Sequence, residues 1–173
     1  MTRTSQPIRI RRFQPQDAGP LAQLFHVSVR QLGIRAYSQA QVEAWSPVPA
    51  SASQFLDRVS DDRQVLVAVA PDDTPEGFIE LRSDGCIDCF YCNPRSAGTG
   101  IGTILYAALE SLAQEAGMPM LTVEASEIAR TFFSHRGFSC IQKQAFRRNG
   151  VLIHNYRMEK QLGKLLDEKP TAT

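Results

Sequence analysis

Three closely spaced glycines separate a strand-like segment from the clearest helical pattern in the sequence. Gly98, Gly100 and Gly102 follow residues 86–92 and precede a stretch with an apolar stripe on one helical face, formed by Ile104, Leu105, Ala108, Leu109 and Leu112. Such a turn gathers several backbone N–H groups at the positive end of the helix dipole, and the missing Cβ atoms let an anion approach them closely. We therefore predict that residues 87–112 bind the pyrophosphate group of a ligand.

Two other phosphate-binding motifs use glycine-rich turns, and the neighbouring residues argue against both. No lysine follows the glycines, as a Walker-type phosphate loop requires. A Rossmann-type site is harder to set aside, because Glu124 lies at the end of the next expected strand, about where a ribose-binding acid would be. Its spacing differs, since Thr103 occupies the place of the last glycine. A Rossmann-type nucleotide-binding protein and a helix that merely begins with glycines stay open as alternatives.

Length and composition indicate one domain that binds a small molecule. The chain has 173 residues, of which 43% are hydrophobic, which is enough for a core of its own. Its net charge of +1 provides no overall field that would favour nucleic acid or an anionic membrane. The first seven residues lack the apolar segment of a signal peptide, and no apolar run approaches the ~20 residues of a membrane span. We expect a cytoplasmic protein with one domain over residues 1–163 and a flexible tail over residues 164–173.

Three cysteines are spaced like ligands of a metal or an iron–sulfur cluster. Cys86, Cys89 and Cys92 lie, however, in a segment whose apolar and aromatic neighbours predict a strand. Alternation along a strand would send Cys86 and Cys92 to one face and Cys89 to the other. No glycine or proline provides the turns of a metal knuckle. We expect structural thiols and no metal.

Apolar periodicity and turn residues predict strands and helices along the whole chain. Strands are expected at residues 8–13, 64–70, 77–81, 86–92, 120–123, 141–147 and 151–158. Helices are expected after Pro15, at residues 39–45 with Ser38 as the cap, around residues 55–59, after the glycine turn, and from Ser126 to Phe133. The dipeptide Asn149-Gly150 favours a tight hairpin between the last two strands.

The order of these motifs resembles the GNAT N-acetyltransferases. The resemblance rests on a strand followed by Asn93-Pro94, the glycine turn, an amphipathic helix and a further strand, and then Ala129 to Phe133 and Arg136-Gly137-Phe138. Tyr37-Ser38, residues 41–47, Ile87-Asp88 and residues 155–160 are similar to the YafP-type branch of these proteins. The resemblance implies a single α/β (α+β) domain with a mixed, mostly antiparallel twisted sheet of about six to seven strands, flanked by about four helices.

Acetyl-CoA is the co-substrate that this resemblance implies. The backbone of Phe90 to Cys92 would pair with the pantetheine arm, and residues 98–103 would hold the pyrophosphate. The implied cofactor-binding residues are Phe90, Tyr91, Cys92, Ala97, Gly98, Thr99, Gly100, Ile101, Gly102, Thr103, Ser126 and Phe132. Two positions depart from the family pattern. Ala97 stands where the family usually has glutamine or arginine, so Arg95 is expected to supply that charge, and Phe133 stands where the family often has a tyrosine acid.

Acetyl transfer to an amine requires a base, because an amine with a pKa of ~10.4 is protonated at neutral pH. Asp88 is the first candidate, since it lies on the strand that would flank the thioester. Glu80 on the neighbouring strand is the second, and Glu124 is the third. Asp88 could instead be an acid at a strand edge or pair with one of the arginines. A backbone N–H at Tyr91 or Cys92 could stabilise the oxyanion, with no side chain needed.

The acceptor is expected to be a small-molecule amine or a protein amine that binds over the first two helices. Tyr37, Glu43 and Trp45 cluster there before a proline-rich break, although a single aromatic such as Trp45 at helical spacing more often belongs to the core. A homodimer is also possible. Phe133 and Ala97 leave open a second hypothesis, in which the chain is a non-catalytic sensor that binds acyl-CoA.

Overall fold

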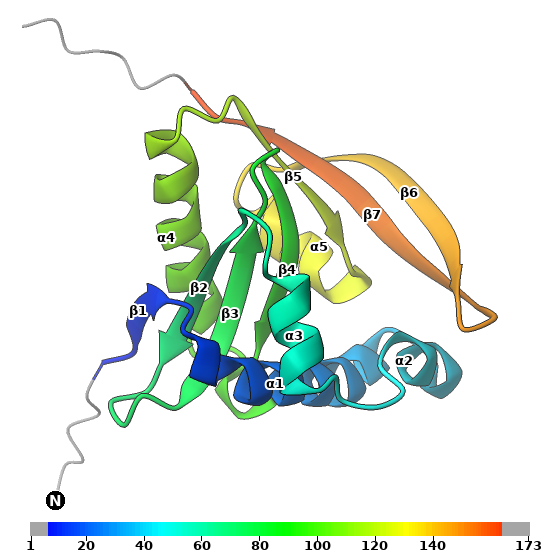
Figure 1. The fold of residues 1–173 in the computed structure, drawn as a ribbon. Coiled ribbons are helices and arrows are strands. Elements are labelled where there is room, and N and C mark those ends of the chain that lie inside the picture. Colours follow the sequence, from blue (N-terminus) through cyan, green and yellow to red (C-terminus); the bar gives the residue numbers. More distant parts are fainter. Residues whose placement is uncertain (1–6, 164–173) are drawn as a thin grey trace, which may run out of the picture.

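The computed structural model describes residues 7–163, so the tail expected at residues 164–173 lies outside this range. In Figure 1, seven strands form one twisted sheet in the order β1-β2-β3-β4-β5-β7-β6, with α-helices on both faces. The strands are β1 (Arg9–Arg12), β2 (Gln64–Val69), β3 (Pro75–Leu81), β4 (Cys86–Cys92), β5 (Met120–Ala125), β6 (Ser139–Arg148) and β7 (Val151–Gln161). The helices are α1 (Ala18–Leu32), α2 (Gln39–Trp45), α3 (Ala52–Arg58), α4 (Ile101–Glu115) and α5 (Glu127–Ser134). The expected α/β fold is confirmed.

All neighbouring strands in the sheet run antiparallel except β4 and β5. A Rossmann fold needs a mostly parallel sheet, so that alternative is wrong. Within residues 7–163, no helix is long and apolar enough to cross a membrane.

Strand β2, the second from one edge of the sheet, is buried on both faces, as its uninterrupted apolar sequence predicts. Leu66 and Ala68 pack with α4 and α5 in one core cluster, whereas Val65 and Val67 pack with α1 and α3 in another. The two-residue period of the strand thus divides the core into two layers.

Serine caps fix where the short helices begin. Ser38 accepts a hydrogen bond from the N–H of Gln41, so α2 has the predicted bounds. Ser51 caps α3 in the same way through Gln54, and α3 therefore begins at Ala52, three residues before the expected start. The serine before α5 caps its helix as predicted.

A gap opens between β4 and β5, the two parallel strands. They pair only where Cys86 lies beside Thr122 and Ile87 lies beside Val123, and they then diverge toward α1 and α2 (Figure 1). The other edge of β5 pairs with β7 along its whole length. The second half of β4 therefore has a strand partner on one edge only.

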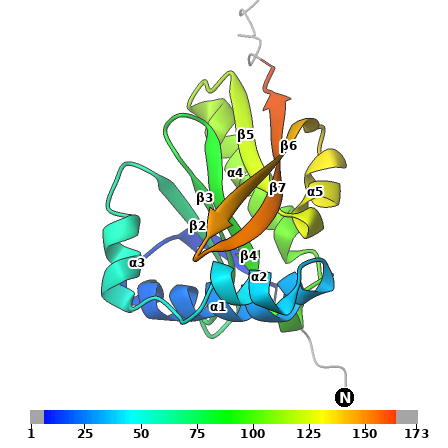
Figure 2. The same ribbon diagram turned by 90° about the vertical axis from the view of Figure 1, so that its right-hand side faces the viewer.

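The hairpin of β6 and β7 reaches back over α2 at the open end of this gap (Figure 2). Its turn is the predicted Asn149-Gly150, and both residues have positive φ, at 48° and 78°. Asn149 donates a hydrogen bond to the carbonyl of Ala44 at 2.9 Å, and Gln41 donates one to the carbonyl of Leu152 at 2.9 Å. These bonds hold the hairpin against α2.

Candidate active site

The glycine turn has the geometry of an anion cradle. Gly98 and Gly100 have φ of +77° and +91°, a left-handed conformation that glycine adopts without strain. A Cβ at either position would meet nothing within 4 Å, so the turn is open on that side. Helix α4 begins at Ile101, and the N–H groups of its first turn have no acceptor within the helix. The turn therefore presents backbone donors and space together.

Gly102 serves the packing of the turn. A Cβ there would lie 3.1 Å from the Phe90 ring and 3.5 Å from the Phe132 ring. Only glycine lets the start of α4 approach β4 and α5 this closely. The rings of Phe90 and Phe132 also contact each other, with centroids 5.0 Å apart. These contacts fix the cradle relative to the gap between β4 and β5.

A buried carboxylate braces the loop before the cradle. Glu76 is 6% exposed, accepts a hydrogen bond from Ser96 at 2.6 Å and pairs with Arg95. Burial acts to raise the pKa of Glu76, but the hydrogen bonds from Arg95 and Ser96 outweigh it, so its pKa falls below the usual value. The charge of Arg95, which was expected to replace a side chain missing at Ala97, is thus shared with Glu76.

Arg136 is a second cation beside the cradle, and the sequence did not single it out for this place. It donates to the Thr103 hydroxyl at 2.7 Å, and its guanidinium carbon lies 3.4 Å from the centroid of the Phe132 ring. No carboxylate lies within ion-pair distance of it among residues 7–163. Its charge is therefore available to an anion at the turn.

A cavity of about 450 Å³ extends from the cradle along β4 to α1 and α2; we call it the donor cavity. It is bordered by every residue expected to bind the cofactor except Thr99, namely Phe90, Tyr91, Cys92, Ala97, Gly98, Gly100, Ile101, Gly102, Thr103, Ser126 and Phe132. The Thr99 hydroxyl instead donates to the carbonyl of Ser96 at 2.6 Å, which stabilises the turn from within. Further residues of α1, α2 and α5, which no sequence motif indicated, complete the wall, among them Val29, Gln41 and Ala129.

The second half of β4 directs free backbone groups into the gap. The N–H of Asn93 bonds to the carbonyl of Glu76 on β3 at 2.8 Å. Hydrogen-bonding direction alternates along a strand, so the N–H groups of Phe90 and Cys92 point the other way, where β5 has diverged. These two groups can pair with an extended ligand or with a developing oxyanion.

A larger cavity of about 1000 Å³, which we call the acceptor cavity, lies between β4, β5 and the β6–β7 hairpin. Trp45 and Tyr91 border both cavities. Burial raises the pKa of the Tyr91 hydroxyl far above its usual value, so this group stays neutral. The two cavities therefore meet at an aromatic junction.

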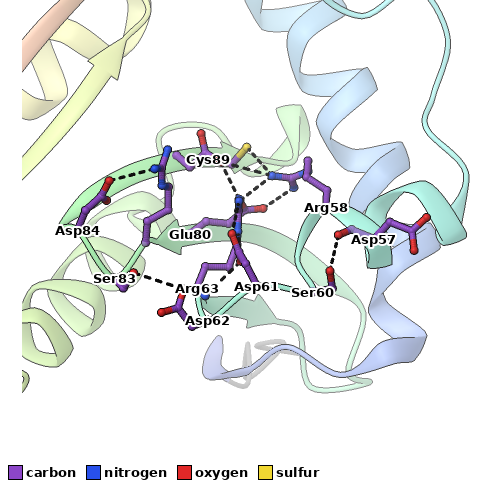
Figure 3. Close-up of polar contacts among 12 residues, drawn as sticks. Asp57, Arg58, Ser60, Asp61, Asp62, Arg63, Glu80, Ser83, Asp84 and Cys89 are labelled. Atoms are coloured by element: carbon purple, nitrogen blue, oxygen red, sulfur yellow. Dashed lines mark hydrogen bonds and ion pairs between the residues drawn. The ribbon is translucent and has the colours of Figure 1, made fainter.

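The three candidate bases have different surroundings, and Figure 3 shows those of Glu80. Asp88 borders the acceptor cavity with a side chain that is 39% exposed, and it accepts a hydrogen bond from Arg63 at 2.6 Å. Glu80 is fully buried between Arg58 and Arg63, at 2.5 and 2.8 Å, and borders neither cavity. Glu124 borders the acceptor cavity and has no cationic partner within ion-pair distance among the described residues.

A β-bulge in β4 makes the predicted orientation of the cysteines wrong. Asp88 and Cys89 together oppose the single residue Glu80, so the alternation of faces is interrupted there. Cys86 and Cys89 consequently border the same cavity, whereas Cys92 borders the other. The bulge also turns Asp88 into the acceptor cavity.

The three residues expected to contact the acceptor are only partly brought together. Tyr37 and Trp45 border the donor cavity near its junction with the acceptor cavity. The Tyr37 hydroxyl accepts from the N–H of Glu127 at 2.8 Å and donates to the carbonyl of His154 at 3.0 Å, so it ties α5 to β7. Glu43 borders neither cavity and instead faces Arg30 at 3.4 Å.

Phe133, at the position where the family often has a tyrosine acid, is 1% exposed and lies in the core. Its ring packs against those of Phe90, Tyr106 and Phe138 and borders neither cavity. Phe132, its neighbour on α5, borders the donor cavity instead.

Comparisons with known proteins agree with this geometry. A family model described as an acetyltransferase (GNAT) domain matches residues 34–160. An uncharacterized N-acetyltransferase of Escherichia coli K12, YafP, is 30% identical over 151 residues, which cover 87% of this chain and 94% of YafP. A crystal structure of a GCN5-related N-acetyltransferase from Rhodopseudomonas palustris has a TM-score of 0.83 at 34% identity and covers 94% of this chain and 100% of its own. The PaiA N-acetyltransferase of Thermoplasma acidophilum, solved with coenzyme A, has the same fold at 21% identity, with a TM-score of 0.73 and coverage of 91% and 100%.

Proposed function

Because this chain belongs to the GNAT acetyltransferases, we propose that it transfers the acetyl group of acetyl-CoA to the amine of a small molecule or a protein. Membership of the family makes the chain an acyltransferase. One observation supports the choice of reaction most directly. A cavity that begins at an anion cradle meets a second, charge-lined cavity at Trp45 and Tyr91. Two substrates can therefore reach one point from opposite sides.

In this proposal the donor cavity binds acetyl-CoA through main-chain groups. The first turn of α4 and the glycines before it hold the pyrophosphate, with Arg136 beside them. The free N–H groups of Phe90 and Cys92 bind the pantetheine arm and the thioester oxygen. The open space at Gly98 and Gly100 fits this role, because a side chain there would occupy the position of the phosphates.

The acceptor amine enters from the acceptor cavity, and Asp88 removes its proton directly or through a water molecule. The neutral nitrogen then attacks the thioester carbon, so that a C–N bond forms and the C–S bond breaks. The CoA thiolate departs and takes up a proton, which requires only weak acid assistance because thiols have a pKa around 8.5. The attacking nitrogen releases its remaining excess proton to solvent, which leaves the neutral amide. This agrees with the phenylalanine at position 133, which can donate no proton.

The proposal is tested by measuring acetyl-CoA binding with calorimetry and CoA release with a thiol reagent over a panel of amines. Asp88→Asn should lower kcat by a factor of about 10² to 10⁴ without changing the Kd of acetyl-CoA. Asp61→Asn is a matched control, because Asp61 also pairs with Arg63, at 2.7 Å, but borders neither cavity. Absence of acetyl-CoA binding would overturn the proposed function. Full activity of Asp88→Asn would assign the base to another group, which Glu124→Gln would then test.

A further inference from the structure

The walls of the acceptor cavity carry charged groups of both signs, most of which are already paired. Arginine side chains line it at four positions and carboxylates at three, which are Arg58, Arg82, Arg148, Arg157, Asp84, Asp88 and Glu124. Arg82 pairs with Asp84 at 3.0 Å, and Arg157 pairs with Glu159, outside the lining, at 3.0 Å. Within residues 7–163, Arg148 and Glu124 have no partner within ion-pair distance. One cation and one anion are thus left for a ligand.

Arg148 lies at the junction of the two cavities. Its guanidinium carbon is 5.8 Å from the centroid of the Trp45 ring, which borders both cavities. Its charge is also close enough to Tyr91 to oppose the rise in the pKa of that hydroxyl, which burial causes. The tight turn at Asn149 brings Arg148 here, because it folds the hairpin back over α2 (Figure 2).

Glu124 lies on the same wall, on the neighbouring strand β5. It is opposite Arg157 of β7, and Asn155 of β7 is opposite Gln144 of β6. Because Asn155 and Arg157 are two residues apart on one strand, their side chains share a face, and Asn155 is a diagonal neighbour of Glu124. Glu124 and Asn155 therefore form one polar surface, and Arg148 lies four residues along β6 from Gln144.

Asn155, which borders the same cavity, contains a buried polar atom without a hydrogen-bond partner among the described residues. The residue is 3% exposed, and the unpartnered atom is its Oδ1. Buried polar atoms are nearly always paired in folded proteins. An amide oxygen can accept a hydrogen bond from an ammonium or amine group, and so can the adjacent Glu124 carboxylate.

We propose that the acceptor is an amine that also carries a carboxylate or a comparable anionic group, as amino acids do. Arg148 binds this group at the junction, next to the point where the amine meets the thioester, and Glu124, with Asn155 beside it, faces the remainder of the acceptor. This rests on the proposed function. A polyamine is disfavoured, because its second cation would face the unpaired Arg148. A guanidinium binds a carboxylate through two parallel hydrogen bonds, so the contact discriminates by geometry as well as by charge.

Pairs of amines that differ in one group test this inference. They are 6-aminohexanoate with 6-aminohexanamide, L-lysine with L-lysinamide, and L-phenylalanine with L-phenylalaninamide, with 1,6-diaminohexane as the polyamine. In at least one pair the carboxylate should have a kcat/KM at least tenfold higher than the amide, mainly through a lower KM. Arg148→Met should bring the two members of that pair to within about twofold. Arg147→Met is the matched control, since Arg147 is the adjacent residue, borders neither cavity and donates to the carbonyl of Gly150 at 3.0 Å.

Binding can also be followed without turnover. Trp45 is the only tryptophan, so its fluorescence should respond to hexanoate in the wild-type protein and in Arg147→Met, but not in Arg148→Met. Equal kcat/KM for carboxylate and amide in every pair, or a preference for the diamine, would overturn the inference and leave the proposed function standing. An equal loss in Arg148→Met for both members of a pair would also overturn it, since that result would indicate a merely structural role. CoA release with none of the amines would remove the proposed function and this inference together.

Discussion

Replacing Gly100 by alanine separates the structural role of the glycine turn from its role in binding. Gly100 precedes the first residue of α4, with φ of +91°, and Gly117 follows the same helix, with φ of +69°. At both positions an added Cβ would meet nothing within 4 Å. Gly100 borders the donor cavity and Gly117 does not. The two substitutions therefore impose the same kind of backbone strain, and only one places a methyl group at the proposed phosphate site.

The expected magnitudes follow from these two effects. A left-handed conformation costs a residue with a Cβ roughly 1–2 kcal/mol, so both variants should lose about that much free energy of unfolding. For a chain of this size, the loss corresponds to a fall in Tm of about 2–8 °C. In Gly100→Ala the methyl group also displaces the phosphate from at least one backbone N–H. A hydrogen bond to a charged group contributes about 1.5–3 kcal/mol, so acetyl-CoA should bind roughly 10- to 100-fold more weakly.

Thermal unfolding and calorimetric titration with acetyl-CoA measure the two effects separately. Gly100→Ala and Gly117→Ala should have similar Tm values, and only Gly100→Ala should have a raised Kd. Titration with desulfo- or free CoA adds a control, because the loss should not depend on the acetyl group. If Gly100→Ala bound acetyl-CoA as tightly as the wild type, the pyrophosphate would not lie at this turn. If Gly117→Ala weakened acetyl-CoA binding as much as Gly100→Ala does, the loss would come from global destabilisation and not from the turn.

Three further predictions concern buried groups. Glu80→Gln removes a fully buried charge from between two arginines and should lower the free energy of unfolding, measured by urea titration, by about 3 kcal/mol. The kcat per folded molecule should stay within about threefold of the wild type. A large loss of kcat without destabilisation would instead identify Glu80 as a base. Phe133→Tyr buries a hydroxyl in the core and should lower stability by about 1–3 kcal/mol without raising kcat; a higher kcat would show that the site needs this acid. Burial raises the pKa of the Cys92 thiol to about 11, so its alkylation by iodoacetamide should be slow at pH 8, become faster as the pH rises toward that value, and be blocked by CoA. The exposed Cys140 is the control and should react at pH 8 whether or not CoA is present. Fast labelling of Cys92 that CoA does not prevent would contradict its place in the donor cavity.

The strands and helices could be predicted from the sequence where local chemistry determines them. Ser38 caps α2 at the predicted residue, and Asn149-Gly150 makes the predicted turn, because both signals act over four residues or fewer. The bulge at Asp88 and Cys89 could not be predicted, since it depends on how β4 pairs with β3, and no glycine or unusual residue in β4 marks it. One extra residue was enough to reverse the expected orientation of the cysteines.

The two halves of the candidate site differ in the same way, because one depends on neighbouring residues and the other on residues far apart in the sequence. The proposed phosphate cradle is built from consecutive backbone groups between Gly98 and Thr103, so three glycines before an amphipathic helix suffice to predict the conformation of this turn. The acceptor cavity is lined from α1, α2, α3, β4, β5, β6 and β7. Arg148, which has no ion-pair partner among residues 7–163, lies more than 100 residues from the Trp45 ring that it faces. In the sequence, Arg148 is one of two arginines before a turn and has no feature that distinguishes it from Arg147. Only the docking of the hairpin on α2 distinguishes the two, because it places Arg148 at the cavity and leaves Arg147 bonded to its own turn. Acceptor specificity in this chain should therefore respond to substitutions in the hairpin that leave acetyl-CoA binding unchanged.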